Sequence, residues 1–177
     1  MQNVSIQAIL VILLTLVCAV TDWRHGKVYN ALTYPAAAFG LALSAFVDSP
    51  PLSSSASGLV ACLLFFGALW YAGGLGAGDV KLLAAVGALK GLPFVAHACF
   101  YIVCAAAVAG LFLLAWQGRL KPVSKWIVVT LASVVIPGMS APPLEGGKTS
   151  VPFAPFIFVG TCVTAYVEIV SGAPLSF

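Results

Sequence analysis

Charged side chains are scarce in this sequence. Of 177 residues, eight are Lys or Arg and five are Asp or Glu, so 7% of the chain is charged while 62% is hydrophobic. A soluble domain of ordinary composition carries about 25% charged residues. So few charges cannot cover a soluble surface, which excludes a soluble globular protein. The net charge of +3 therefore bears on membrane topology, and no nucleic-acid partner is predicted.

Motifs for metals and nucleotides are also missing. The five cysteines lie in apolar runs without a C-x-x-C pair, which predicts buried free thiols and no zinc module. The glycine-rich stretch GGLGAGDVKLL, residues 73–83, matches neither the P-loop pattern nor the dinucleotide-binding fingerprint. There is no repeat of fixed period and no segment with the composition of a soluble domain. We therefore expect no metal and no other cofactor.

Apolar runs are the abundant feature. A membrane crossing needs roughly 20 apolar residues, and six runs reach or approach that length. The predicted fold class is therefore all-α, a polytopic membrane protein of about six transmembrane helices, in a single domain over residues 1–177. The predicted spans are Val4–Thr21, Ala31–Val47, Ser57–Ala72, Asp79–Leu89, Phe94–Trp116 and Val151–Val170.

The distribution of Lys and Arg predicts the orientation. With six alternating spans, only Lys90 faces one side of the membrane. Because basic residues concentrate in cytoplasmic loops, the opposite side is expected to be the cytoplasm. The seven basic residues on that side are Arg24, Lys27, Lys81, Arg119, Lys121, Lys125 and Lys148.

Two segments are predicted to lie between spans. Asp48–Gly58, rich in Ser and Pro, is expected to be an outer linker. Trp126–Ile136 is apolar but too short to cross, so an interfacial or partly inserted segment is expected there.

Two of the five acidic residues differ from the rest. Asp48, Glu145 and Glu168 fall in the outer linker, in the cytoplasmic loop and near the outer end of the last span, where solvent or the interface accounts for them. Asp22 and Asp79 each stand where a span meets the cytoplasmic side, and so at the same level. Ionisable groups at membrane depth are costly, which marks both as functional candidates.

The fourth span sharpens this expectation. From Asp79 to Lys90 a helix covers roughly 18 Å at 1.5 Å per residue, whereas the hydrocarbon core is about 30 Å thick. If Lys90 reaches the outer interface, Asp79 lies below the cytoplasmic surface, and the glycine-rich loop Gly73–Gly78 lies within the membrane zone. Irregular backbone survives there where it lines a cavity or is covered by protein. The glycines then leave room for an extended segment beside Asp79.

Two carboxylates facing one cavity favour general acid–base chemistry. A pair that shares one proton can activate water with one partner and polarise a carbonyl with the other. Asp79 opens a helix and Asp22 follows a helix end, so the helix dipoles favour Asp79 as the base. Coupled titration leaves the assignment open. His25 either tunes Asp22 or is an ordinary interfacial residue.

Three stretches resemble one family. Gly76-Ala77-Gly78-Asp79-Val80-Lys81 is similar to the G-x-G-D motif of intramembrane aspartyl proteases, and its GAGDVKLLAAVGALKG context resembles the type IV prepilin peptidases. The segment Asp22–Asn30 resembles that family's first motif, with Tyr29 where Pro is common. Val151–Phe156, VPFAPF, resembles the proline-rich start of the last span. The resemblance covers nearly the whole chain in order.

The resemblance implies a reaction and roles for named residues. Prepilin peptidases cut short basic leaders from pilins and pseudopilins at the cytoplasmic face of the bacterial inner membrane, after a Gly and before a hydrophobic helix. By carry-over, Asp22 and Asp79 are the catalytic pair, and Gly76 and Gly78 shape the loop. The implied partners are the prepilin helix and the bilayer.

In lacking cysteine pairs, the chain resembles the short form of the family. Larger members carry a zinc-binding insert and methylate the new N-terminus; this chain has no such insert. It looks like the short form of tight-adherence (Flp) pilus systems, called TadV or CpaA, so no metal is predicted and methyl transfer is not implied.

Other functions stay open at this stage. Intramembrane acids also suit a small proton-coupled transporter, although no paired repeat appears and both acids lie towards one face. A non-catalytic pilus assembly factor is the third candidate. Lys27 and Lys81 either contact an acidic residue of the substrate or follow from the positive-inside bias alone.

Overall fold

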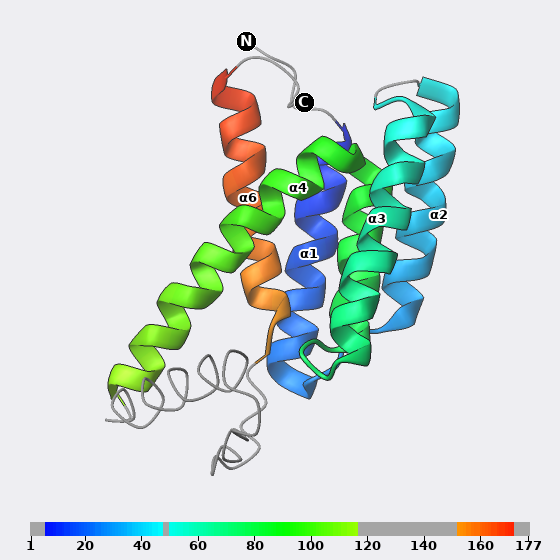
Figure 1. Ribbon diagram of the computed structural model, residues 1–177. Coiled ribbons are helices and arrows are strands. Elements are labelled where there is room, and N and C mark those ends of the chain that lie inside the picture. Colours follow the sequence, from blue (N-terminus) through cyan, green and yellow to red (C-terminus); the bar gives the residue numbers. More distant parts are fainter. Residues whose placement is uncertain (1–5, 48–49, 117–151, 172–177) are drawn as a thin grey trace, which may run out of the picture. The chain divides into compact units, whose positions relative to one another are not determined.

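The chain folds into helices that match a membrane protein. The computed structural model describes residues 6–47, 50–116 and 152–171, and every regular element in these ranges is a helix (Figure 1). Each helix is long and apolar enough to cross a membrane, which confirms the predicted all-α polytopic class. The helices are α1 (Ile6–His25), α2 (Asn30–Val47), α3 (Leu52–Tyr71), α4 (Ala77–Trp116) and α6 (Ala154–Ser171).

The chain divides into two compact units. The first runs to Ala105 and resumes at Pro152, and the second lies between them in the sequence. Of the second unit the structure describes only residues 106–116, the last part of α4. The predicted interfacial segment Trp126–Ile136 and the basic residues from Arg119 to Lys148 therefore lie outside the described residues, as does Asp48.

The predicted outer linker was wrong over most of its length. Helix α3 begins at Leu52, inside the segment Asp48–Gly58. Pro51 stands at its N-cap with extended backbone, and its carbonyl accepts hydrogen bonds from the N–H groups of Ser54 and Ser55. Proline next to a helix start loses no intrahelical hydrogen bond. The serine hydroxyls also find partners, since Ser55 lies 2.6 Å from the hydroxyl of Ser44 on α2.

The predicted fourth and fifth spans are two arms of α4. Gly91 has non-helical backbone angles, φ 81° and ψ 173°, so the helix breaks there. A side chain is strained at that φ, which glycine tolerates. Helical structure resumes at once, because Pro93 stands in the first turn of the second arm, where its missing N–H costs nothing. The break thus falls within Lys90–Pro93, the stretch between the predicted fourth and fifth spans.

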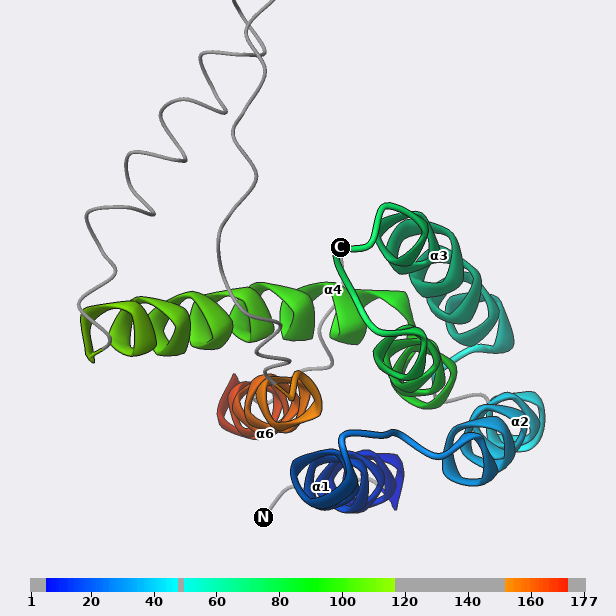
Figure 2. The ribbon, with the colours of Figure 1, turned by 90° about the horizontal axis from the view of Figure 1, so that it is seen from below.

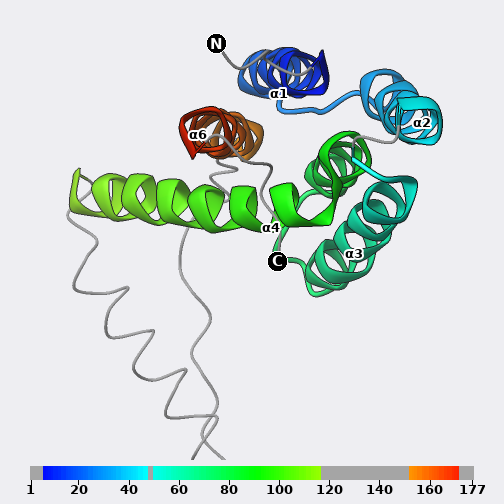
Figure 3. The same cartoon turned by 90° about the horizontal axis from the view of Figure 1, so that it is seen from above.

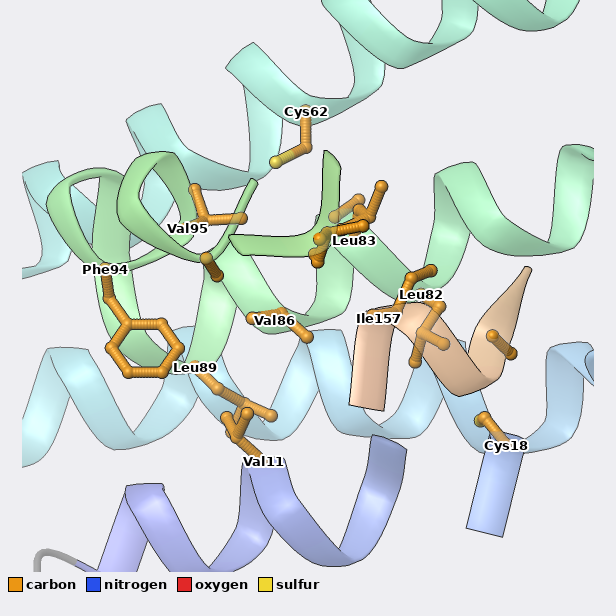
Figure 4. Close-up of a cluster of buried hydrophobic side chains, with 14 of the residues drawn as sticks. Val11, Cys18, Cys62, Leu82, Leu83, Val86, Leu89, Phe94, Val95 and Ile157 are labelled. Atoms are coloured by element: carbon orange, nitrogen blue, oxygen red, sulfur yellow. The ribbon is translucent and has the colours of Figure 1, made fainter. Parts of the chain in front are cut away.

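The first arm of α4 is the central helix of the first unit. Seen along the helices, it lies among α1, α2, α3 and α6 (Figures 2 and 3). From Asp79 to Gly91 every residue except Lys81 is buried. The apolar cluster around it draws Val11 from α1 and Ile157 from α6 (Figure 4). A helix that is apolar all round needs such complete cover.

Glycines let the neighbouring helices approach this arm. An added Cβ at Gly58 of α3 would lie 2.8 Å from the carbonyl oxygen of Gly87, and one at Gly40 of α2 would lie 2.8 Å from the backbone of Ala88. Small residues at contacts of this kind let backbones pack closely in membrane proteins. The close approach of α2 and α3 thereby covers two sides of the first arm of α4.

The helices of the first unit alternate in direction. The C-terminal end of α1 and the N-terminal end of α6 lie at the same, lower end of Figure 1. The loop that connects α3 to the start of α4 lies at that end as well. Asp22 in the last turn of α1 and Asp79 in the first turn of α4 therefore share one end of the helix bundle.

The close packing at Gly58 predicts that alanine substitutions at two glycines of α3 differ in their effect on stability. Replacement Gly58→Ala puts a methyl group against the backbone of Gly87, Gly91 and Leu92, all within 2.9 Å, and should lower stability by about 1–3 kcal/mol. Gly67→Ala is the matched control, because an added Cβ there meets nothing within 4 Å. It should leave stability unchanged or raise it by up to about 1 kcal/mol. Thermal unfolding in detergent measures both, and equal midpoints would contradict the packing described.

Candidate active site

Asp22 is held by the end of α1. The helix continues past the predicted span end at Thr21 to His25, which places Asp22 in its last turn. Gly26 terminates the helix with a φ of 62°, and its N–H donates to the main-chain carbonyl of Asp22 over 2.8 Å. Glycine is the residue that accepts this left-handed conformation at a helix C-terminus. The Asp22 side chain points inward and is 8% exposed.

Asp79 is held by the start of α4. The chain turns at Gly73, with a φ of 80°, and reaches Gly76, whose carbonyl accepts hydrogen bonds from the N–H groups of Asp79 and Val80 at 3.1 and 3.2 Å. Gly76 is thus the residue before the first turn. An acid in a first turn is favoured by the helix dipole. Asp79 is also 8% exposed.

The two glycines of the GAGD stretch are each needed for a different steric reason. A Cβ at Gly76 would lie 2.8 Å from Oδ2 of Asp79, so the missing side chain leaves room for the carboxylate. A Cβ at Gly78 would lie 2.9 Å from the Cβ of Val28, in the connection between α1 and α2. Gly76 therefore leaves space for the Asp79 carboxylate, and Gly78 lets the α1–α2 connection pack against the start of α4.

The two acids lie within range of one another's charge. Asp22 and Asp79 interact electrostatically, and both interact with the thiol of Cys18, one turn before Asp22 on α1. Residues far apart in the sequence thus meet at one buried place. Within the described residues no group of three His, Cys, Asp or Glu side chains gathers into a candidate metal site.

The N-terminus of α6 supplies a partner that the sequence analysis missed. The N–H of Ala154 donates to Oδ2 of Asp22 over 3.1 Å, in a buried contact. Ala154 is the first residue of α6, Pro155 has no N–H, and the N–H groups of Phe156 and Ile157 bond to the carbonyl of Phe153. The proline-rich start VPFAPF was the signal, because it leaves one free donor at this helix end.

This contact changes the electrostatic argument about Asp22. Judged from α1 alone, a negative charge at a helix C-terminus is disfavoured. In the structure the same carboxylate lies at the N-terminus of α6 and accepts its free N–H. Both acids therefore lie at a helix N-terminus, and the helix dipoles no longer favour Asp79 over Asp22 as the base.

One carboxylate oxygen is free to accept a hydrogen bond. Oδ1 of Asp79 is buried and has no hydrogen-bond partner within the described residues. A buried polar atom of this kind calls for an explanation, such as a role in the chemistry of the site. Asp22 is thus held by the Ala154 N–H, and Asp79 has a backbone hydrogen bond at Gly76 but keeps one oxygen that can accept a proton or bind water.

The basic candidates lie at the edge of this site. Lys81 donates from Nζ to Oδ1 of Asn30 over 2.9 Å and lies over the ring of Tyr34, so it ties α4 to α2. Lys27 is exposed in the connection between α1 and α2. His25 is exposed at the end of α1, where its ring meets Tyr29 edge-on.

Glu168 was expected to be explained by the outer interface, but it has a specific partner. Its carboxylate meets Nζ of Lys90 at 2.7 and 2.9 Å, and this ion pair joins α6 to α4. The pair lies near the last turn of α6, at the opposite end of that helix from Ala154.

Comparison with known proteins identifies one family. A family model described as the type IV leader peptidase family matches residues 9–141, which include both acids and end before α6. No curated protein matches the chain, and no solved structure does.

The Ala154 hydrogen bond predicts a difference between two neutral variants of Asp22. In Asp22→Asn the amide oxygen still accepts the Ala154 N–H, whereas in Asp22→Leu, of similar size, this buried donor is left without a partner. Asp22→Leu should therefore be less stable than Asp22→Asn by about 1–3 kcal/mol. Both variants remove the same charge, so thermal unfolding of the two in detergent isolates the hydrogen bond. Equal stabilities would mean that Asp22 does not accept from α6.

Proposed function

The chain belongs to the type IV leader peptidase family, and we propose that it is an aspartyl endopeptidase that removes the short basic leader from type IV or Flp prepilins or pseudopilins. Family membership supports a membrane-embedded leader peptidase in general terms. The proposal adds the acid pair as the catalytic group, the class of leader and the cytoplasmic side of the bacterial inner membrane.

The placement of two buried carboxylates, Asp22 and Asp79, at one end of the helix bundle is the observation that carries the proposal. The two buried carboxylates come from different helices and interact electrostatically at one end of the bundle. Like charges that share a buried site retain one proton between them. A neutral acid beside an ionised one is the arrangement with which aspartic proteases hydrolyse peptides by water.

The steps of hydrolysis follow from the shared proton. The ionised carboxylate takes a proton from water, and the resulting hydroxide attacks the carbonyl carbon of the scissile peptide. The protonated carboxyl donates to the carbonyl oxygen, which stabilises the tetrahedral intermediate. The carboxyl that was protonated by water then donates its proton to the amide nitrogen, and the other carboxylate takes a proton from a hydroxyl of the intermediate as the C–N bond breaks. The products are a carboxylic acid and an amine, and the pair ends with one proton, as it began. The unpaired Oδ1 of Asp79 is suited to hold the water.

The glycine-rich loop suits an extended substrate. Gly73, Gly74 and Gly76 are exposed, directly before Asp79 in the chain. Backbone without side chains lets another chain approach its N–H and C=O groups. A leader that ends just before an apolar helix would lie in extended form along this loop, while the helix itself remains in the lipid.

Charge supports the cytoplasmic side. Arg24 lies in the last turn of α1, Lys27 follows that helix, and Lys81 lies in the first part of α4, at the end of the bundle that holds the acids. Lys90 lies towards the other end of that arm and is neutralised by Glu168. By the positive-inside rule the acid end faces the cytoplasm.

Neutral amides at the two acids test the proposal directly. Asp22→Asn and Asp79→Asn should each lower kcat for leader removal by at least about 10³-fold, because either change leaves a single carboxyl, which cannot act as base and acid at the same time. Purified protein in detergent is incubated with a prepilin, and the shortened product is followed by mass spectrometry. Thermal unfolding establishes that both variants remain folded.

The other candidate functions give different results in the same experiment. A non-catalytic assembly factor would produce no shortened pilin even as the wild type. A proton-coupled transporter would also produce none, but would acidify proteoliposomes in a manner that depends on the acids. Cleavage that persists in both Asn variants would refute the acid pair as the catalytic group.

The position of Gly76 predicts a specific loss of rate. In Gly76→Ala the new methyl group meets Oδ2 of Asp79, the far end of a flexible side chain, so the fold survives while the carboxylate moves. Misplacement of a catalytic group by about 1 Å can cost up to about 10²-fold in rate, and we expect a loss of about 10- to 100-fold in kcat. Gly67→Ala is the control, since its Cβ meets nothing within 4 Å and the residue lies in α3, outside this loop. Equal activity of the two variants would show that the space at Gly76 is not needed.

A further inference from the structure

The partly buried ion pair between α4 and α6 has no part in the chemistry described so far. Nζ of Lys90 lies 2.7 Å from Oε2 and 2.9 Å from Oε1 of Glu168, and it also lies over the ring of Phe94. The side chains are 6% and 20% exposed. In a chain with only five acidic and eight basic residues, a charge pair away from the acid site calls for its own explanation.

Net stability is a poor explanation for such a pair. The cost of removing two charges from water offsets much of their attraction, and replacing a buried pair by apolar residues of similar volume is often neutral or stabilising. What a buried pair does provide in the best-attested cases is a unique alignment of the elements that carry it. The charges on α4 and α6 meet in one register only, whereas apolar surfaces pack in several.

The register of α6 matters because of its other end. Ala154, whose N–H holds Asp22, lies roughly 21 Å along α6 from Glu168, and Asp79 lies roughly 17 Å along α4 from Lys90, at 1.5 Å per residue. Both helical segments are continuous between these points. A slip of α6 by one residue moves its N-terminus by about 1.5 Å and turns it by about 100°. Such a shift breaks the 3.1 Å contact to Asp22.

The hydroxyl contact between α6 and α1 restrains the register of α6 less than the ion pair does. The hydroxyls of Thr15 on α1 and Thr161 on α6 lie 3.2 Å apart. Each threonine also bonds to carbonyls of its own helix, at 2.8 Å for Thr15 and at 2.9 Å for Thr161. These hydroxyls keep a partner if the helices slide, whereas the charges of Lys90 and Glu168 lose theirs.

We propose that Lys90 and Glu168 are positioning residues, whose ion pair sets the register of α6 so that the Ala154 N–H meets Asp22. The inference rests on the proposed function, because its readout is the rate of leader removal. The pair acts on the acids through α6 and through the first arm of α4, and it does not touch the substrate. Its loss therefore lowers kcat and leaves KM for the prepilin unchanged.

Two double variants test the proposal. Lys90→Met with Glu168→Leu removes both charges, should keep the thermal midpoint, and should lower kcat by about 10- to 100-fold through misplacement of the Asp22 donor. Lys90→Glu with Glu168→Lys restores an ion pair of reversed sign, and should return kcat to within a few-fold of the wild type. KM is expected to stay within about twofold in both. Thr164→Val is the matched control on α6, since among the residues that the structure describes this buried hydroxyl bonds only to Gly160 of its own helix.

The outcomes separate this inference from the function itself. If the wild type does not cleave, or if Asp22→Asn cleaves, the proposed function fails. If the acid variants are inactive but the apolar double variant keeps full kcat, only the positioning role is refuted. A folded charge-swap variant that is as slow as the apolar one refutes it as well. Should the apolar variant not fold, the charge-swap variant decides alone. A kcat within a few-fold of the wild type supports the positioning role, and a folded variant that is about 10-fold slower or more refutes it.

Discussion

The structure depends on the cost of placing carboxylates inside an apolar helix bundle. Asp22 and Asp79 are each 8% exposed, so bulk water solvates them little, and donors from the protein take much of its place. Helix N-termini offer such donors together with a favourable dipole. Asp79 opens α4, and Asp22 is met by the N–H of Ala154 at the start of α6. The site therefore exists only where two helix starts and one helix end converge.

That convergence explains the short first arm of α4. The arm ends at Gly91, so it brings Asp79 into the bundle rather than to its surface. Because it is apolar all round, it needs helices on every side, and glycines at positions 40, 58 and 87 let α2 and α3 approach it. The exposed loop before Asp79 then remains open to an extended chain. Glycines in the helices thus let α2 and α3 enclose the arm. Glycines in the loop before α4 leave the side of Asp79 accessible.

Much of this was accessible from the sequence because its signals are local. Lengths of apolar runs predicted the spans, and the Lys90–Pro93 stretch predicted the break in α4. The serine-rich start of α3 was misjudged as a linker, because serine is ambiguous until its hydroxyl finds a partner, as Ser55 does with Ser44 of α2. The use of Ala154 as a donor was missed because a main-chain N–H carries no residue type that a motif can show.

By itself the sequence determined the membrane class, the all-helical fold and the two acids that stand at span ends, since the scarcity of charge, the lengths of apolar runs and the residues at their ends are read along the chain without knowledge of any contact. It also carried the likeness to leader peptidases that the family comparison established. Only the tertiary structure decided which helix end meets Asp22, and that Lys90 pairs with Glu168. Contacts between distant segments depend on helix rotation and register, and a rotation of about 100° per residue turns a small slip into a different partner.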